Sequence, residues 1–191
     1  SFYQGKNLGA YGDAGAIVTN DDELATRARR FANHGALEKH DHEIEGINSR
    51  MDGLQAAILS TKLPHLEKWN AKRLKHARVY SELLEGVSVV ETPKIHPEVR
   101  HVFHLYVIRT DKRDQLRARL GSESIAIEIH YPKALSFLKV YEYQVHRPND
   151  FLLAYDYHSN IFFLPMYPEM TKEMVYHVYD AIEKFYQGIL R

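Results

Sequence analysis

The sequence predicts an α/β protein whose two parts are joined by a long, kinked helix. Segments with apolar residues at helical spacing alternate along the chain with short runs rich in β-branched and aromatic residues. A composition of 45% hydrophobic and 26% charged residues is ordinary for a globular protein. Pro64 interrupts the longest helical stripe, and a helix with such a break is a natural bridge between domains.

The chain opens with a glycine-rich loop that leads into a short apolar run at residues 16–19, which predicts a short buried strand. Asn20 is then expected to cap a helix, because Glu23 follows in the capping-box position. Gly35 supplies the stop signal for this helix. The polar segment 36–47 predicts a loop.

A second and longer helix is expected to begin at Asp52, with Gln55 at its N3 position, and to end at Gly86. Its apolar stripe consists of Leu54, Ile58, Leu66, Trp69, Ala77, Tyr80 and Leu84. Pro64 removes one backbone donor and crowds the preceding turn, so the helix should kink or divide there. We therefore expect a domain boundary near 64–70.

The rest of the chain alternates between strands and helices. Strands are expected at Val87–Val90, Val102–Arg109, Ile125–Tyr131 and Ile161–Leu164. Asp111 is expected to cap a helix that runs through Leu120, and residues 133–160 are expected to form helical pieces. Thr171 should cap the last helix, whose apolar face would contain Met174, Val178, Ile182 and Phe185.

Charge and composition exclude several classes of function. Lysine plus arginine equals aspartate plus glutamate at 25 each, which removes the long-range electrostatic argument for nucleic acid or an acidic membrane as partner. The absence of cysteine excludes disulfide scaffolds, zinc–thiolate sites and cysteine nucleophiles, and it fits a reducing compartment. Without a spanning apolar run or a signal-peptide pattern, we expect a cytoplasmic protein.

No metal site is expected despite 12 histidines. His101 and His104 are three residues apart in an expected strand, so their side chains would point to opposite faces. His40 and His42 lie in a polar loop that offers no clear third ligand. The 13 tyrosines are scattered and have no basic stripe beside them, which disfavours base stacking.

Lys6 has the most informative local context in the chain. The segment from residue 5 to residue 15 contains four glycines, which allow the backbone to approach a ligand closely. Phe2, Tyr3 and Tyr11 could exclude water from an amine. A desolvated lysine has a lowered pKa and can form an imine with an aldehyde. The same pattern also permits an ordinary solvent-exposed lysine.

Five segments, in order along the chain, resemble the DegT/StrS-type sugar aminotransferases, which belong to the aspartate aminotransferase fold type I. The segments are residues 1–20 (SFYQGKNLGAYGDAGAIVTN), 33–35 (NHG), 48–59 (NSRMDGLQAAIL), 129–132 (IHYP) and 164–169 (LPMYPE). Their order over nearly the whole chain makes the resemblance specific.

The resemblance implies a fold and a division into domains. Residues 1–66 would be the C-terminal part of the cofactor-binding large domain, and residues 67–191 would be the smaller α/β C-terminal domain. The chain would then be the second half of a longer enzyme. The first half would supply the carboxylate that pairs with the pyridine nitrogen and the group that stacks on the cofactor ring. We therefore expect the chain alone not to bind the cofactor productively.

The resemblance also implies pyridoxal 5'-phosphate as the cofactor. Lys6 would form the internal aldimine and would act as base and acid in the 1,3-proton shift. Ser1 would hydrogen-bond the cofactor phosphate. Asn48 would reach the phosphate of the neighbouring subunit's cofactor across a homodimer interface with shared active sites. On the residues alone, Ser1 could be an ordinary terminal serine and Asn48 a turn residue before a helix.

Arg50, His130 and Tyr131 would bind substrate according to the same resemblance. Arg50 would place positive charge near a phosphate or the amino donor's carboxylate, and the other two would lie near the sugar. Without the resemblance, Arg50 reads as a surface ion-pair partner, and the pair before Pro132 reads as strand-end packing.

The implied reaction transfers an amino group from an amino acid, glutamate by resemblance, to a keto nucleotide sugar. Retention of Lys6 disfavours the dehydrase branch of the family, in which this lysine is replaced. The segment Asn149-Asp150-Phe151-Leu152 departs from the family's usual Gly-Asp-Phe-Pro, which weakens substrate assignment by analogy. Two alternatives stay open: a truncated, non-catalytic dimerisation or regulatory fragment, and an aminotransferase acting on a keto-cyclitol.

Overall fold

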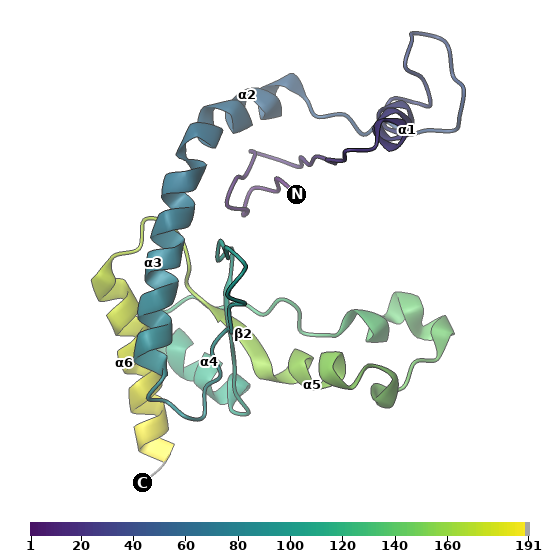
Figure 1. Ribbon diagram of the computed structural model, residues 1–191. Helices are drawn as coiled ribbons and strands as arrows, with labels where there is room; N and C mark the ends of the chain where they lie inside the picture. Colours follow the sequence, from purple (N-terminus) through teal and green to yellow (C-terminus); the bar gives the residue numbers. More distant parts are fainter. Residues whose placement is uncertain (190–191) are drawn as a thin grey trace. The chain divides into compact units, whose positions relative to one another are not determined.

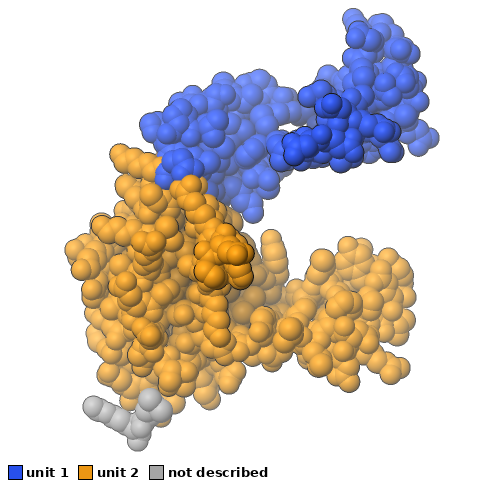
Figure 2. Space-filling model, in the orientation of Figure 1, with its two compact units in different colours: residues 1–67 blue, residues 68–191 orange. Residues whose placement is uncertain are grey.

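The chain divides into two compact units. The computed structural model describes residues 1–189, and the units are Ser1–Glu67 and Lys68–Arg191, the second described through Ile189 (Figure 2). The described part is an α/β structure with six α-helices and one two-stranded sheet (Figure 1).

Helix α1 (Asp22–Ala32) opens the regular structure of the first unit. Its N-cap is Asp21, whose carboxylate accepts a hydrogen bond from the Leu24 N–H at 3.0 Å. The predicted cap, Asn20, is therefore wrong by one residue. Asp21 is the N-cap because its side-chain oxygen accepts a hydrogen bond from one of the first-turn N–H groups, which have no partner within the helix.

Gly35 redirects the chain after α1. Its φ is +83°, its N–H donates to the Arg30 carbonyl at 2.8 Å, and its own carbonyl accepts from Glu43 and Ile44. A Cβ at this position would lie 1.6 Å from the Ile44 oxygen, so only glycine fits. Residues 36–47 form the expected loop, with one isolated bridge between Ala36 and His42.

Residues 16–19 do not form the strand that the sequence predicts. Ile17 is 77% exposed and Val18 is 93% exposed, so the expected burial is wrong as well. A strand is stable only beside a partner that pairs its N–H and C=O groups, and no segment of residues 1–189 forms a ladder with this one. The apolar pattern is present without the neighbour it requires.

Helix α2 (Gly53–Lys62) is followed by the 3₁₀ turn η1 (Leu63–His65) and helix α3 (Leu66–Leu84) (Figure 1). Pro64 lies in η1, so the predicted break in the long helix is confirmed. Proline cannot donate to the preceding turn, and the chain tightens locally instead of continuing as an α-helix.

The second unit contains the sheet. Strand β1 (Tyr106–Arg109) pairs antiparallel with β2 (Ile161–Leu164), in a register that places Tyr106 opposite Leu164. Tyr106 and Ile108 are buried on the same face as Phe162 and Leu164. The predicted strand at 161–164 is confirmed, whereas the one at 102–109 is shorter than expected.

The strands expected at 87–90 and 125–131 are wrong. The second segment contributes one isolated bridge to the sheet, Glu128 with Phe163, whereas the bridge next to the first segment belongs to Glu91, which pairs with Arg109. Val87 and Val90 are instead held in turns by hydrogen bonds to carbonyls three residues back. Most β-branched residues of the two segments pack against the sheet in the hydrophobic core, but the segments are not strands of the sheet.

Helices α4 (Arg113–Ser122) and α6 (Lys172–Ile189) complete the second unit. The N-cap of α4 is Lys112 rather than the expected Asp111, and it makes no side-chain capping bond. The Thr171 hydroxyl accepts from the Met174 N–H at 3.3 Å, which confirms the predicted cap of α6. The buried face of α6 is Val175, Val178, Ala181, Ile182 and Tyr186, so the predicted face is shifted by about one residue.

The main hydrophobic core lies wholly in the second unit. Its buried residues come from α3, β1, α4, β2, α6 and nearby loops, and they range from Ala77 to Tyr186. Burial raises the pKa of the Tyr106 hydroxyl to about 12, although hydrogen bonds with Ser81 and Thr92 oppose that shift. Across residues 1–189 we find no helix with the length and apolar character that a bilayer crossing requires.

Arg73, a buried residue of α3, joins two loops of this unit. Its Nη1 donates to the carbonyls of Phe103, His104 and Met166 at 3.2, 3.1 and 2.7 Å. Phe103 is itself buried with a φ of +41°, a conformation that a bulky residue adopts only under constraint. Residues 101–105 therefore form no strand, and the bend at 104–105 is held by Arg73, so the expectation that His101 and His104 lie in a strand is wrong.

Residues 133–160 form helical pieces, as predicted. They are η2 (Leu135–Phe137), η3 (Lys139–Gln144), η4 (Pro148–Phe151) and α5 (Leu152–Asn160). None of these elements carries a buried residue, and in the ribbon they extend away from the α3–α6 core of their unit (Figure 1).

Candidate functional site

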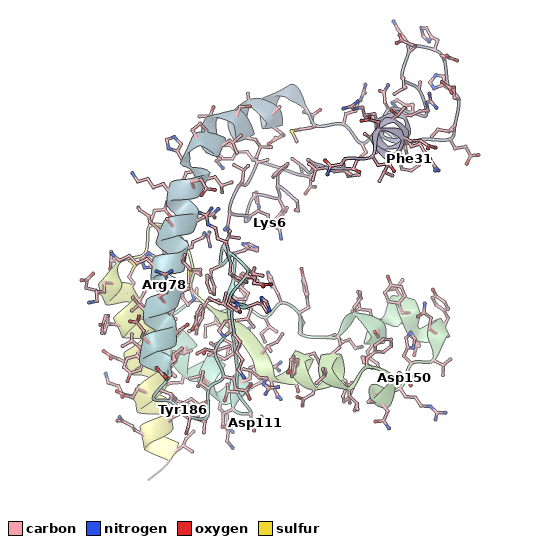
Figure 3. The ribbon with its side chains drawn as sticks, in the orientation of Figure 1. Lys6, Phe31, Arg78, Asp111, Asp150 and Tyr186 are labelled. Atoms are coloured by element: carbon pink, nitrogen blue, oxygen red, sulfur yellow. The ribbon has the colours of Figure 1, made fainter. Side chains whose placement is uncertain are left out.

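Lys6 lies in a loop that is closed by backbone hydrogen bonds. The Lys6 N–H donates to the Tyr3 carbonyl at 2.8 Å, which forms a tight turn. At the base of the loop, the Phe2 carbonyl accepts from Ala10 and the Phe2 N–H donates to Ala14, both at 2.8 Å. The half-buried Lys6 side chain projects from this segment (Figure 3).

Gly9 makes the closure possible. A Cβ on Gly9 would lie 2.3 Å from the Gln4 carbonyl oxygen, so a larger residue would force the loop open. At Gly9, the absence of a side chain therefore allows close contact between two parts of the same loop, and not between the loop and a ligand. Within residues 1–189, the Lys6 ammonium has no hydrogen-bond or ion-pair partner.

Ser1 and Arg50 line the same open hollow of the first unit. The hollow measures about 980 Å³, and its apolar wall includes Ile17, Phe31, Ile47 and Met51. The Ser1 hydroxyl accepts from the Tyr3 N–H at 3.3 Å and retains its own proton as a donor.

Asn48 and Arg50 form a network with Asn33. Arg50 Nε donates to the Asn48 side-chain oxygen at 3.1 Å, and Arg50 Nη1 donates to the Asn33 side-chain oxygen at 3.4 Å. The backbones of Asn33 and Asn48 also pair in an antiparallel bridge. Arg50 thus orients the oxygen of the Asn48 amide, and the Asn48 NH₂ group is a donor for an anionic ligand.

Gln55 and Lys62 are site residues that the sequence interpretation did not identify. Gln55 was expected to complete a capping box, but its Oε1 accepts from the Tyr11 N–H at 2.8 Å. Lys62 Nζ donates to the Gly9 carbonyl at 2.6 Å and lies 4.5 Å from the centre of the Tyr11 ring. The sequence does indicate that the two belong together, because a separation of seven residues places both side chains on one face of a helix.

His130 and Tyr131 lie in the second unit, whereas Ser1, Lys6, Asn48 and Arg50 lie in the first. The two rings stack with centroids 5.0 Å apart, and His130 contacts the Phe163 ring edge-on at 4.9 Å. Tyr131 is 72% exposed, so its hydroxyl is accessible to a ligand.

These residues fit a phosphate and an aldehyde. A serine hydroxyl, an asparagine NH₂ and an arginine guanidinium are all donors to anionic oxygens, and a primary amine can bond to an aldehyde carbon. Among the described residues, no three histidine, aspartate or glutamate side chains gather in a way that could hold a metal ion. The candidate site of the first unit therefore consists of three hydrogen-bond donors, Ser1, Asn48 and Arg50, and one amine, Lys6.

Comparison with known proteins gives consistent relatives. A pleiotropic regulatory protein of Geobacillus stearothermophilus is 43% identical over 189 residues, which are 98% of this chain and 51% of that protein. A dTDP-3-amino-3,4,6-trideoxy-alpha-D-glucose transaminase of Streptomyces venezuelae is 36% identical, over 99% of this chain and 50% of that enzyme. The chain therefore spans about half the length of the curated relatives it matches.

Solved structures have the same fold. DesV of S. venezuelae, determined with a ketimine intermediate, matches 96% of this chain and 50% of its own length with a TM-score of 0.91 and 37% identity. NtdA of Bacillus subtilis, solved with the cofactor PMP, matches 94% of this chain and 45% of its own with a TM-score of 0.78 and 30% identity. Residues 1–183 match the DegT/DnrJ/EryC1/StrS aminotransferases, which are pyridoxal-phosphate-dependent, and the chain belongs to this family.

Proposed function

We propose that this chain is the C-terminal half of a pyridoxal-phosphate-dependent aminotransferase that converts a keto nucleotide sugar to an amino sugar. Glutamate is the proposed amino donor. The observation that carries the proposal is the placement of Lys6, an amine without a partner among the described residues, in a loop closed by its own backbone. The relative named as a dTDP-amino-sugar transaminase supports the substrate class.

The proposed roles of the cofactor-binding residues follow from their chemistry. Bound pyridoxal phosphate supplies a conjugated ring that accepts the electron pair of the substrate carbon when its proton leaves. Lys6 Nζ would hold the cofactor in the resting protein. Once the amino group of the donor has displaced it, the free amine would take that proton and deliver it to a different carbon, which completes the 1,3-proton shift. The Ser1 hydroxyl and the Asn48 NH₂ group donate to phosphate oxygens, and Asn48 does so for a second copy of the chain.

Three residues have proposed roles on the substrate side. Arg50 binds the carboxylate of the amino donor, since a guanidinium can donate two parallel hydrogen bonds to it. His130 and Tyr131 contact the sugar. In this proposal residues 1–66 are the end of the large domain, residues 67–191 are the small domain, and the protein is a cytoplasmic homodimer with shared active sites.

A test of Lys6 uses the full-length protein. Adding pyridoxal phosphate should produce the visible absorption band of lysine-bound cofactor. Reduction with borohydride should then leave the cofactor covalently attached to the peptide that contains Lys6. Lys6→Ala should abolish both signals, whereas Lys39→Ala, at an exposed loop position, should preserve them. The absence of a band in the wild-type protein would contradict the assignment.

A second candidate function is that of a non-catalytic regulatory or dimerisation chain. The relative named as a pleiotropic regulatory protein favours this candidate. Cofactor titration and size measurement on the 191-residue chain separate the two. A dimer that binds no cofactor, even when the first half is supplied, would favour regulation. A panel of keto sugars and keto-cyclitols with glutamate then decides the acceptor class.

A further inference from the structure

One face of α2 is directed at the base of the loop that carries Lys6. Gln55, Leu59 and Lys62 are separated by four and three residues, so they lie in one row on the helix surface. Leu59 is the buried residue of this helix, at 7% exposure. The row therefore has an apolar centre with a polar group at each end.

The two polar groups hold two backbone positions of the loop. The Tyr11 N–H donates to Gln55 Oε1 at 2.8 Å, and Lys62 Nζ donates to the Gly9 carbonyl at 2.6 Å. The Lys62 ammonium also lies 4.5 Å from the centre of the Tyr11 ring, a cation–π distance. One contact uses a backbone donor and the other a backbone acceptor, so together they fix the position and the direction of the segment.

The residue between these two positions is held from the other side. Ala10 is fully buried, and its N–H donates to the Phe2 carbonyl at 2.8 Å. Gly9 is pressed against the Gln4 carbonyl with no room for a Cβ. The segment from Gly9 to Tyr11 is thus fixed to α2 on one side and to the start of the Lys6 loop on the other.

We propose that Gln55 and Lys62 are positioning residues that hold Lys6 in place for its reaction. This inference rests on the function proposed above for Lys6. A loop by itself is mobile, whereas a side chain that hangs from a segment fixed to a helix keeps a defined location. A displacement of about 1 Å at a reacting group can cost about 100-fold in rate, so holding the loop has a large effect on catalysis. Lys62 acts as a bound ammonium, and Lys6 acts as the reactive amine.

Amide hydrogen exchange of cofactor-free, full-length protein tests the contacts themselves. Gln55→Leu removes the acceptor and Lys62→Met removes the donor, so each should speed exchange of the peptide covering residues 5–12 by about tenfold or more. Gln55→Glu keeps an acceptor oxygen and should exchange like the wild type. Ala57→Gly, at an exposed position of α2, weakens the helix without touching either contact and serves as the matched control.

Cofactor attachment and steady-state kinetics test the positioning role. At saturating cofactor, Gln55→Leu and Lys62→Met should slow borohydride-trappable attachment at Lys6 and lower kcat, each by about tenfold or more, with KM for the amino donor changed less than about threefold. Gln55→Glu should restore both quantities, and Ala57→Gly should lower the melting temperature only.

The outcomes separate this inference from the function on which it rests. The positioning role is overturned, while the Lys6 assignment stands, by either of two results. One is cofactor attachment at Lys6 that is slowed no more in the two variants than in Ala57→Gly. The other is an unchanged rate of hydrogen exchange in residues 5–12. A wild-type protein that never attaches cofactor at Lys6 overturns the proposed function, and the positioning role with it. Faster exchange together with slower attachment in both variants supports the inference.

Discussion

His76 is a buried side chain of α3 whose Nε2 has no hydrogen-bond partner among the described residues. Burial lowers its pKa, and the charges of Lys75 and Lys72 act in the same direction, whereas a hydrogen bond with the Pro168 backbone opposes them. The folded protein therefore favours the neutral imidazole.

This pKa shift makes the stability of the second unit depend on pH. Unfolded chains bind the proton at a histidine pKa of about 6.5, and the folded protein binds it only at lower pH. The contribution of His76 to the free energy of unfolding is thus intact above about pH 6.5 and is lost as the pH falls through the folded pKa. His76→Gln should flatten the fall in melting temperature between about pH 7.5 and pH 5.

A matched control is His177→Gln, at an exposed position of α6, which should leave the slope of melting temperature against pH unchanged. If His76→Gln keeps the full wild-type slope, acid sensitivity resides in other groups.

At the scale of elements, local signals predicted helices better than strands. Pro64 and Thr171 act through their own backbone and side chain, so the helix break and the cap follow directly from sequence. The run at 16–19 had the right apolar pattern, but a strand depends on a partner whose register local sequence does not specify. The same reason explains why residues 87–90 and 125–131 form no strand, although Glu91 and Glu128 make isolated bridges to the sheet.

The candidate site shows the same division. Lys6, Asn48 and Arg50 were identifiable because they stand in segments that resemble a known family. Gln55 and Lys62 lie 44 and 53 residues along the sequence from their partners Tyr11 and Gly9. Such long-range contacts depend on how the loop packs against α2, which local sequence does not specify. The contact between Arg50 and Asn33, 17 residues apart, is of this kind as well.

The turn after α1 provides a test at this scale. Gly35→Ala introduces a Cβ that meets the Ile44 oxygen at 1.6 Å and imposes a strained positive φ. It should lower the free energy of unfolding by more than about 2 kcal/mol, or unfold the loop at 36–47 locally. Thermal denaturation and hydrogen exchange of that loop measure the effect.

Gly53→Ala is the control for this substitution. A Cβ at Gly53 meets nothing within 4 Å, and the position is the first residue of α2. Its stability should change by less than about 1 kcal/mol, in the favourable direction. Equal effects of the two substitutions would show that the Gly35 backbone is not constrained as described.

At the scale of the whole molecule, the two units differ in how much core they contain. Every residue of the main hydrophobic cluster lies between Ala77 and Tyr186, whereas the buried hydrophobic residues described in the first unit are Ala10, Ala36 and Leu59. Because burial of apolar surface is the dominant favourable term in folding, stability should reside mainly in the second unit.

Separate expression of the two parts tests this expectation. A fragment from Leu66 to the C-terminus keeps α3 entire and should unfold in one cooperative thermal transition. The fragment of residues 1–65 should show no such transition, because it buries too little apolar surface. A gradual, non-cooperative melt of the longer fragment would contradict the assignment of an independent C-terminal domain.

The seven-residue separation of Gln55 and Lys62 has a consequence for how this sequence can change in evolution. An insertion of one residue between them would rotate Lys62 by about 100° around the axis of α2 and carry its amine away from the Gly9 carbonyl. Substitutions at the outward positions of the helix leave both contacts in place. Members of a lineage that keeps the reaction should therefore vary in the composition of this stretch of α2 but conserve its length.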